Sequence, residues 1–133
     1  YELNHIKPVG LDQLLKSADI VTLHTPLDDS TRNILNRQKL ELMKPSAILI
    51  NAARGGLVDE VALRNMLQDN RIAAAAFDVF AVEPPEDKEL LELPNFLVTP
   101  HIGGSAEEAI LAMGMAAIEG LDNAKDPLIF ARN

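Results

Sequence analysis

Four short, continuous apolar runs constrain the fold of this chain more than any other feature of its sequence. They are residues 20–23, 47–50, 73–79 and 96–99. None of them alternates cleanly between apolar and polar residues, as a strand with one solvent-exposed face would. Continuous runs are typical of strands that are covered on both faces, so we expect four parallel strands inside one sheet.

Helical patterns fill the intervals between the runs. Asn36 can cap a short helix over residues 37–43, and Asp59 can cap a helix over residues 60–68. Strands that alternate with helices imply right-handed crossovers and a parallel sheet. The predicted fold class is therefore α/β, with a parallel sheet of the Rossmann-like type.

The longest helix is expected near the end of the chain. Ser105 and Glu108 have the spacing of a capping box, which opens a helix that ends near Asn123. Small and apolar residues recur along it at helical spacing. This stripe indicates close packing against another helix, in a partner domain or subunit.

Composition excludes several classes of function. The formal net charge of -8 and the pI near 4.7 argue against nucleic acid or an anionic membrane surface as a partner, because the overall field repels phosphates. The chain has no cysteine, so disulfides and thiolate metal sites are impossible, which fits a cytoplasmic location. No apolar run approaches the roughly 18 residues of a membrane span. Histidines and aspartates at metal-ligand spacing are also absent, so no metal site is predicted.

Polar residues lie at or just after the end of each run, and pairs of glycines follow the second and the fourth. The loops are His24-Thr25-Pro26 after the first run, Asn51-Ala52-Ala53-Arg54-Gly55-Gly56 after the second, Asp78 and then Glu83-Pro84 in the third, and His101-Ile102-Gly103-Gly104 after the fourth. In a parallel sheet, all these loops follow the carboxyl ends of strands. Open α/β sheets bind their ligands at that edge.

Taken singly, these residues also have structural explanations. A lone histidine beside a strand, such as His24, is more often structural than functional, and Asp59 is fully explained as a helix cap. Arg54 fits an exposed surface, but Gly55-Gly56 indicates a sharp turn or a close approach of a ligand. Asp78, at the end of an apolar strand, needs hydrogen-bond donors. The nucleophile elbow of serine hydrolases and the phosphate loop of nucleotide hydrolases are both absent.

Longer blocks of the sequence resemble the D-isomer-specific 2-hydroxyacid dehydrogenases. The blocks are His24-x-Pro26-Leu27 with Thr31, then residues 50–63, residues 78–84 and residues 94–104. The resemblance extends from about Ala18 to Leu121. Blocks of this length in this order are highly specific, whereas a lone glycine motif is not.

The resemblance implies NAD-dependent hydride transfer between a nicotinamide cofactor and a D-2-hydroxy acid or 2-keto acid. Phosphoglycerate, hydroxypyruvate and glyoxylate are the expected substrate types. Arg54 would bind the substrate carboxylate, and His101 would exchange a proton with the carbonyl oxygen. Glu83 would hydrogen-bond His101 and favour its charged form. Glu83 also disfavours the formate dehydrogenase branch, which has glutamine at that position.

The cofactor, NAD with NADP left open, would lie along the same edge of the sheet. The resemblance places the following residues beside it: His24, Thr25, Pro26, Ala52, Ala53, Arg54, Asp78, His101, Gly103 and Gly104.

The chain also departs from the family pattern, because the Gly-x-Gly-x-x-Gly turn and the residue that selects the ribose are absent. We therefore expect residues 1–125 to be the C-terminal part of an NAD-binding domain that lacks its first βαβ half. Residues 126–133 are expected to begin the return to a substrate domain that is otherwise absent. Such a fragment would be inactive alone, and its exposed sheet edge predicts association, through the edge or as a homodimer.

Two other hypotheses stay open at this stage. The first is an NADH-sensing binding module, because transcriptional corepressors share this fold and its three polar residues. The second is a degraded or partial chain that has a structure but no function of its own.

Overall fold

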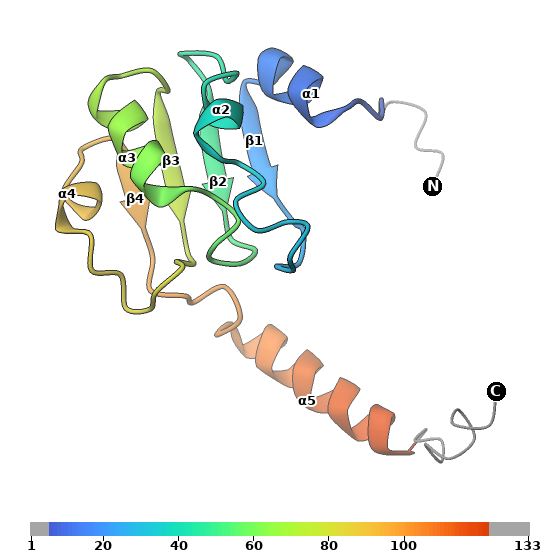
Figure 1. Ribbon diagram of the computed structural model, residues 1–133. Coiled ribbons are helices and arrows are strands. Elements are labelled where there is room, and N and C mark those ends of the chain that lie inside the picture. The colour runs from blue at the N-terminus through green and yellow to red at the C-terminus, as the bar shows by residue number, and fades with distance from the viewer. Residues whose placement is uncertain (1–5, 123–133) are drawn as a thin grey trace. The chain divides into compact units, whose positions relative to one another are not determined.

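The computed structural model describes residues 6–122, which belong to two compact units that divide after His101 (Figure 1). The first unit contains a four-stranded parallel sheet with the order β1-β2-β3-β4. The strands are β1 (Ile20–Leu23), β2 (Ile48–Asn51), β3 (Ala74–Phe77) and β4 (Phe96–Val98). The four predicted strands and the parallel sheet are confirmed, with small differences at the strand ends.

Four helices accompany this sheet: α1 (Leu11–Ser17), α2 (Arg37–Leu40), α3 (Glu60–Gln68) and α4 (Lys88–Leu91). Both predicted caps are confirmed. The side chain of Asn36 accepts a hydrogen bond from the backbone N–H of Lys39, and Asp59 accepts one from Ala62 at 3.0 Å. However, α2 ends three residues before the predicted Met43, because the backbone N–H groups of Leu42 and Met43 bond to the third residue back rather than the fourth.

The sequence patterns do not predict α1 or α4. Helix α4 has only four residues, which is too short for a helical periodicity to be visible. Its cap is Asp87, whose side chain accepts from the backbone N–H of Leu90 at 3.1 Å. Helix α1 begins after Gly10, which offers no side chain to cap it. In both cases the usual start signal or the periodicity is missing.

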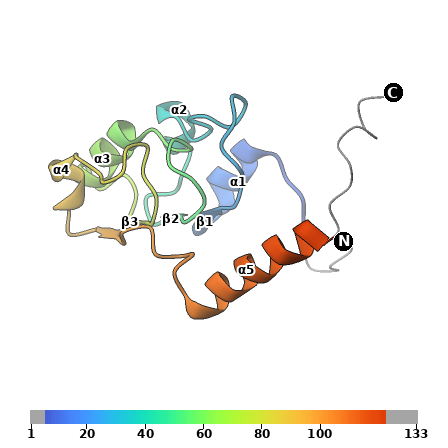
Figure 2. The same ribbon diagram turned by 90° about the horizontal axis from the view of Figure 1, so that it is seen from below.

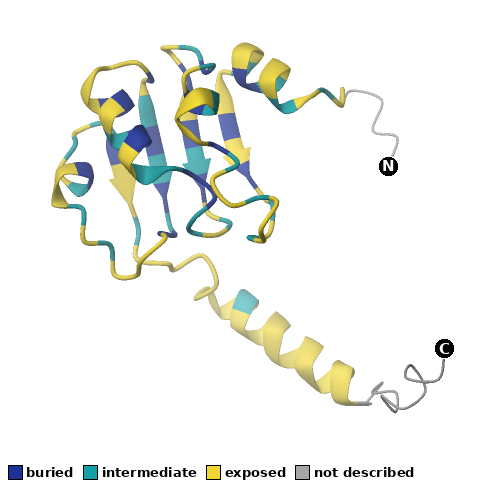
Figure 3. Cartoon of the chain, in the orientation of Figure 1, coloured by how far each residue is buried: buried dark blue, intermediate teal, exposed yellow. Residues whose placement is uncertain are grey.

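The helices of the first unit cover one face of its sheet (Figure 2), and the hydrophobic core lies between the two layers. Leu49 of β2 and Leu63 of α3 are fully buried there. Buried and exposed residues occur along the same strands (Figure 3), and on the face away from the helices Ile20 is 61% exposed and Leu97 is 65% exposed. The prediction that both faces are covered is therefore wrong for the first unit. Each strand pairs with the next along the chain, so right-handed crossovers carry all the connecting helices to one face.

The second unit contains α5 (Glu107–Asp122), which confirms the long helix that the sequence predicts. The expected capping residue is wrong, however. The carbonyl of Ala106 accepts the first helical hydrogen bond from Ile110 at 3.0 Å, so Ser105 precedes the cap position. The predicted helix end at Asn123 and the return segment over residues 126–133 lie outside the described residues. No helix within residues 6–122 combines the length and apolar character that a membrane span requires.

Candidate active site

The loops at the carboxyl ends of the four strands carry most of the predicted site residues. His24 follows β1, Ala52 follows β2, Asp78 follows β3, and Thr99 follows β4. Because all three strand pairs are parallel, these residues lie at the same edge of the sheet.

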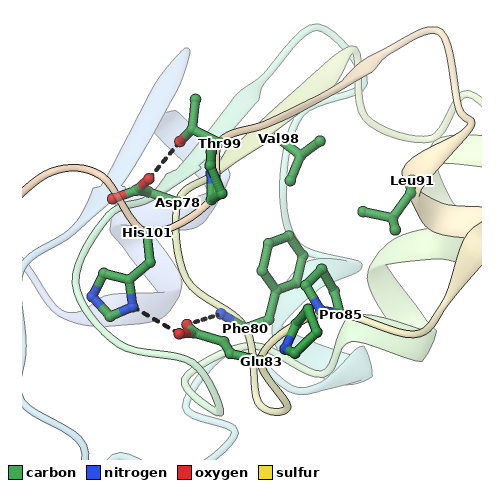
Figure 4. Close-up of a pocket in the computed structure, with 10 residues that line it drawn as sticks. Asp78, Phe80, Glu83, Pro85, Leu91, Val98, Thr99 and His101 are labelled. Carbon is green, nitrogen blue, oxygen red and sulfur yellow. Dashed lines mark hydrogen bonds and ion pairs between the residues drawn. The ribbon is translucent and has the colours of Figure 1, made fainter.

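Glu83 and His101 form a hydrogen-bonded pair at this edge (Figure 4). The distance from Nδ1 of His101 to Oε2 of Glu83 is 2.8 Å. The other carboxylate oxygen, Oε1, accepts a hydrogen bond from the backbone N–H of Phe80 at 3.0 Å. Two donors thus hold the Glu83 carboxylate from two sides, and the peptide bond from Glu83 to Pro84 is cis.

These contacts favour the ionised form of the Glu83 carboxylate. The hydrogen bond from His101 is the main cause that lowers the pKa of Glu83, and the Phe80 N–H contributes in the same direction. Partial burial and the charge of Asp78 oppose them. An ionised Glu83 can only accept hydrogen bonds, so Nδ1 of His101 must be the donor. The second ring nitrogen, Nε2, faces away from Glu83 (Figure 4).

A hollow of about 420 Å³ borders the pair. Its lining is Asp78, Phe80, Glu83, Pro84, Pro85, Leu91, Val98, Thr99, Pro100 and His101. The hydroxyl of Thr99 donates to Oδ1 of Asp78 at 2.5 Å, which ties the end of β4 to the end of β3. His101 has a backbone φ of 55°, in the left-handed region that few residues other than glycine adopt. Such a conformation is characteristic of functional sites.

Arg54 lies after β2, with an exposed side chain whose Nη1 donates to the carbonyl of Ala53 at 2.6 Å. It borders a second hollow of about 300 Å³, together with His24, Thr25, Pro26, Ala52 and Ala53. The structure thus brings Glu83 and His101 together in one hollow and places Arg54 in another. Their convergence on one substrate stays a prediction.

The two glycines after Arg54 serve different purposes. Gly56 has a φ of +79°, which supplies the sharp turn that the sequence indicates. Gly55 packs directly against the backbone of Phe80, and an added Cβ would lie 1.8 Å from the Phe80 carbonyl oxygen. The close approach at Gly55 is therefore made by the chain itself. This packing places the Arg54 loop against Phe80, whose backbone N–H donates to Glu83.

Asn51 is buried and holds the backbone of the Arg54 loop through hydrogen bonds. The sequence analysis did not select it as a site residue. Among residues 6–122 it is the one polar residue that is buried, at 1% exposure. Its side-chain amide donates to the carbonyl of Arg54 at 3.0 Å, and its Oδ1 accepts from the N–H of Ala53 at 3.2 Å. An asparagine at the end of an apolar run was the available signal, because a buried amide must find partners.

The residues at the carboxyl edge fit part of a dinucleotide cofactor. The small side chains of Ala52 and Ala53 leave the hollow beside Arg54 open, while His24 and Thr25 add polar atoms to its lining. His24 itself shares a hydrogen bond with Thr22 at 3.0 Å. A further hollow of about 140 Å³ includes Asp78 and Thr99. Gly103 and Gly104 belong to the second unit. Within the described ranges there is no cluster of three or more residues that would hold a metal ion.

Comparison with known proteins decides the family. Residues 1–103 match the family model described as the NAD binding domain of D-isomer specific 2-hydroxyacid dehydrogenases. The chain belongs to this family. The resemblance that the sequence blocks indicated is confirmed, and so are the Rossmann-like fold and the assignment to an NAD-binding domain.

Individual relatives agree with this assignment. A D-3-phosphoglycerate dehydrogenase of Methanocaldococcus jannaschii is 50% identical over 109 residues, which are 82% of this chain and 21% of the relative. A hydroxypyruvate reductase of Thermotoga maritima is 44% identical over 117 residues, which are 86% of this chain and 38% of the relative. The NAD complexed form of a D-isomer specific 2-hydroxyacid dehydrogenase from Lactobacillus delbrueckii ssp. bulgaricus matches with a TM-score of 0.73 and 37% identity, over 90% of this chain and 42% of that chain. The chain spans less than half the length of each of these proteins.

Proposed function

We propose that the complete protein containing this chain transfers hydride between NAD and a small D-2-hydroxy acid, with the corresponding 2-keto acid as the other partner. The observation that carries the proposal is the Glu83–His101 pair, held at 2.8 Å beside a hollow at the carboxyl edge of the sheet. Phosphoglycerate, hydroxypyruvate and glyoxylate are the substrate types that we propose, in line with the names of the relatives. NADP stays open as a cofactor.

Three residues of this chain then have separate roles at the substrate. Nε2 of His101 gives a proton to the carbonyl oxygen during reduction and takes it back during oxidation. Glu83 holds the imidazole in one tautomer and stabilises its charged form. Arg54 offers a planar fork to the substrate carboxylate, which orients the carbonyl. The nicotinamide supplies or accepts the hydride when it is bound.

The direct test is a rate assay of the complete protein with NADH and a panel of 2-keto acids. Turnover of at least one of them is expected. Tight NADH binding without turnover of any would contradict the proposal and favour a binding module like the transcriptional corepressors.

The proposal also includes a cytoplasmic location and a homodimer. An edge strand such as β1, which has one pairing partner within the described residues, favours association.

Glu83→Gln is expected to change the pH dependence of the reaction. The amide keeps a hydrogen-bond acceptor but removes the negative charge that stabilises the imidazolium. Oxidation of the hydroxy acid requires the neutral imidazole, so its acid limb should move to lower pH. Reduction requires the protonated imidazole, so its alkaline limb should move in the same direction. Profiles of kcat/KM against pH, measured in both directions, check this result. Unchanged profiles would remove Glu83 from this role.

A further inference from the structure

Glu60 is the first residue of α3 and contacts the loop that follows β3. Its Oε1 accepts a hydrogen bond from the backbone N–H of Ala81 at 2.8 Å. The two residues are 21 positions apart, so the contact fixes α3 to the loop that follows β3. The side chain is partly buried rather than free in solvent.

The segment that Glu60 holds is in contact with both parts of the candidate site. We name it the Phe80–Ala81 segment. The N–H of Phe80 donates to Glu83 at 3.0 Å, and Glu83 in turn accepts from His101. The backbone atoms of Phe80 and Ala81 also form the surface against which Gly55 packs, next to Arg54. A displacement of the Phe80–Ala81 segment would therefore reach the acid/base pair and the arginine loop together.

Capping of α3 does not require the Glu60 side chain, although a carboxylate in the first turn also suits the helix dipole. Asp59 already caps α3 through the N–H of Ala62. Burial raises the pKa of Glu60, the bond from Ala81 opposes this, and the charges of Asp87 and Asp59 raise the pKa further. Burial and the neighbouring carboxylates thus disfavour a charge at Glu60, and the hydrogen bond from Ala81 acts in the opposite direction.

We propose that Glu60 is a positioning residue, which holds the Phe80–Ala81 segment so that the Phe80 amide meets Glu83 and the Phe80 carbonyl meets Gly55. The geometric part of the proposal is independent of the reaction. Its effect on turnover rests on the function proposed above.

Two substitutions of Glu60 separate the reach of the side chain from its charge. Glu60→Gln keeps the length and an oxygen that can accept from Ala81, but has no charge. Glu60→Asp keeps the charge and is one methylene shorter, so it cannot make the same contact. The charges of His101 and Asp78 shift the pKa of Glu83, and both variants leave these two residues in place. Met66→Ala, at a buried position of the same helix, is the control for a general loss of stability.

The experiment measures the pKa of Glu83 and the kinetic constants in the complete protein. Glutamates labelled with carbon-13 at the side-chain carboxyl are titrated by NMR, and the Glu83 signal is the one that disappears in Glu83→Gln. Glu60→Asp should raise the pKa of Glu83, because the Phe80 N–H no longer holds the carboxylate, and should lower kcat about tenfold. Glu60→Gln should keep the wild-type pKa of Glu83. Met66→Ala should lower the melting temperature and leave that pKa in place.

Several outcomes would overturn the proposal. The first is a wild-type pKa of Glu83 in Glu60→Asp. The second is an equal shift in Glu60→Gln and Glu60→Asp, because Glu60→Gln keeps the reach of the side chain and would then fail to hold the segment. The third is an equal shift in Met66→Ala, which would assign the effect to stability. If the wild-type protein turned over no 2-keto acid, the proposed function would fail, while the titration would still decide the role of Glu60.

Discussion

His101→Asn is expected to lower kcat about 10²- to 10⁴-fold in the complete protein, the range that a positioned general acid contributes. Asparagine can still donate a hydrogen bond from this position, but it cannot release or take up a proton near neutral pH. The affinity for NADH should change much less than kcat, because in the proposed mechanism the imidazole acts on the substrate oxygen. Steady-state kinetics together with an NADH-binding titration check this result.

A double-mutant cycle with Glu83→Gln gives the matched control. In the proposed mechanism Glu83 acts on the substrate through His101, with which it shares the 2.8 Å hydrogen bond. In the His101→Asn background, the added Glu83→Gln change should therefore have little further effect on kcat. If the double substitution instead lowered kcat by the product of the two separate factors, Glu83 would act on the reaction by another route. A His101→Asn protein that kept most of its kcat would refute the acid/base role.

The sheet could be predicted from the sequence because its information is local. Each apolar run is long enough for one strand, and alternation with helices leaves a parallel sheet as the simple solution. The helix caps Asn36 and Asp59 were equally visible, since each needs only the three residues that follow. The edge of the sheet that carries the candidate site followed from the same logic, because parallel strands bring their carboxyl ends together, whereas the roles of Arg54, Glu83 and His101 were implied by the family resemblance.

The parts that could not be predicted depend on contacts between distant segments. Nothing in the sequence near Glu60 points to Ala81, and nothing near Gly55 points to the Phe80 carbonyl. The exposed sheet face had a different cause. Ile20 and Leu97 are as apolar as the core strands require, so the composition of a strand does not tell which of its faces the unit itself covers.

Gly55→Ala is the second substitution for which we expect a large effect, with a loss of about 3 kcal/mol in the free energy of unfolding. The added Cβ would lie 1.8 Å from the Phe80 carbonyl oxygen and 2.6 Å from the Ala81 nitrogen. Both are backbone atoms, so no side chain can rotate away, and either the Arg54 loop or the Phe80–Ala81 segment must move. Urea unfolding of the complete protein measures the loss.

The same displacement should reduce activity in the fraction that stays folded. A shifted Phe80 withdraws its N–H from Glu83, and a shifted Arg54 loop misplaces the guanidinium, so kcat/KM should fall more than stability alone explains. Gly10→Ala is the matched control, because Gly10 has a φ of -66° and no atom within 4 Å of an added Cβ. It should leave kcat/KM nearly unchanged and cost far less stability than Gly55→Ala, because Gly10 only precedes the first turn of α1. If Gly55→Ala behaved like Gly10→Ala, the close packing between the Arg54 loop and the Phe80–Ala81 segment would not exist in solution, and the link between the arginine and the acid/base pair would be lost with it.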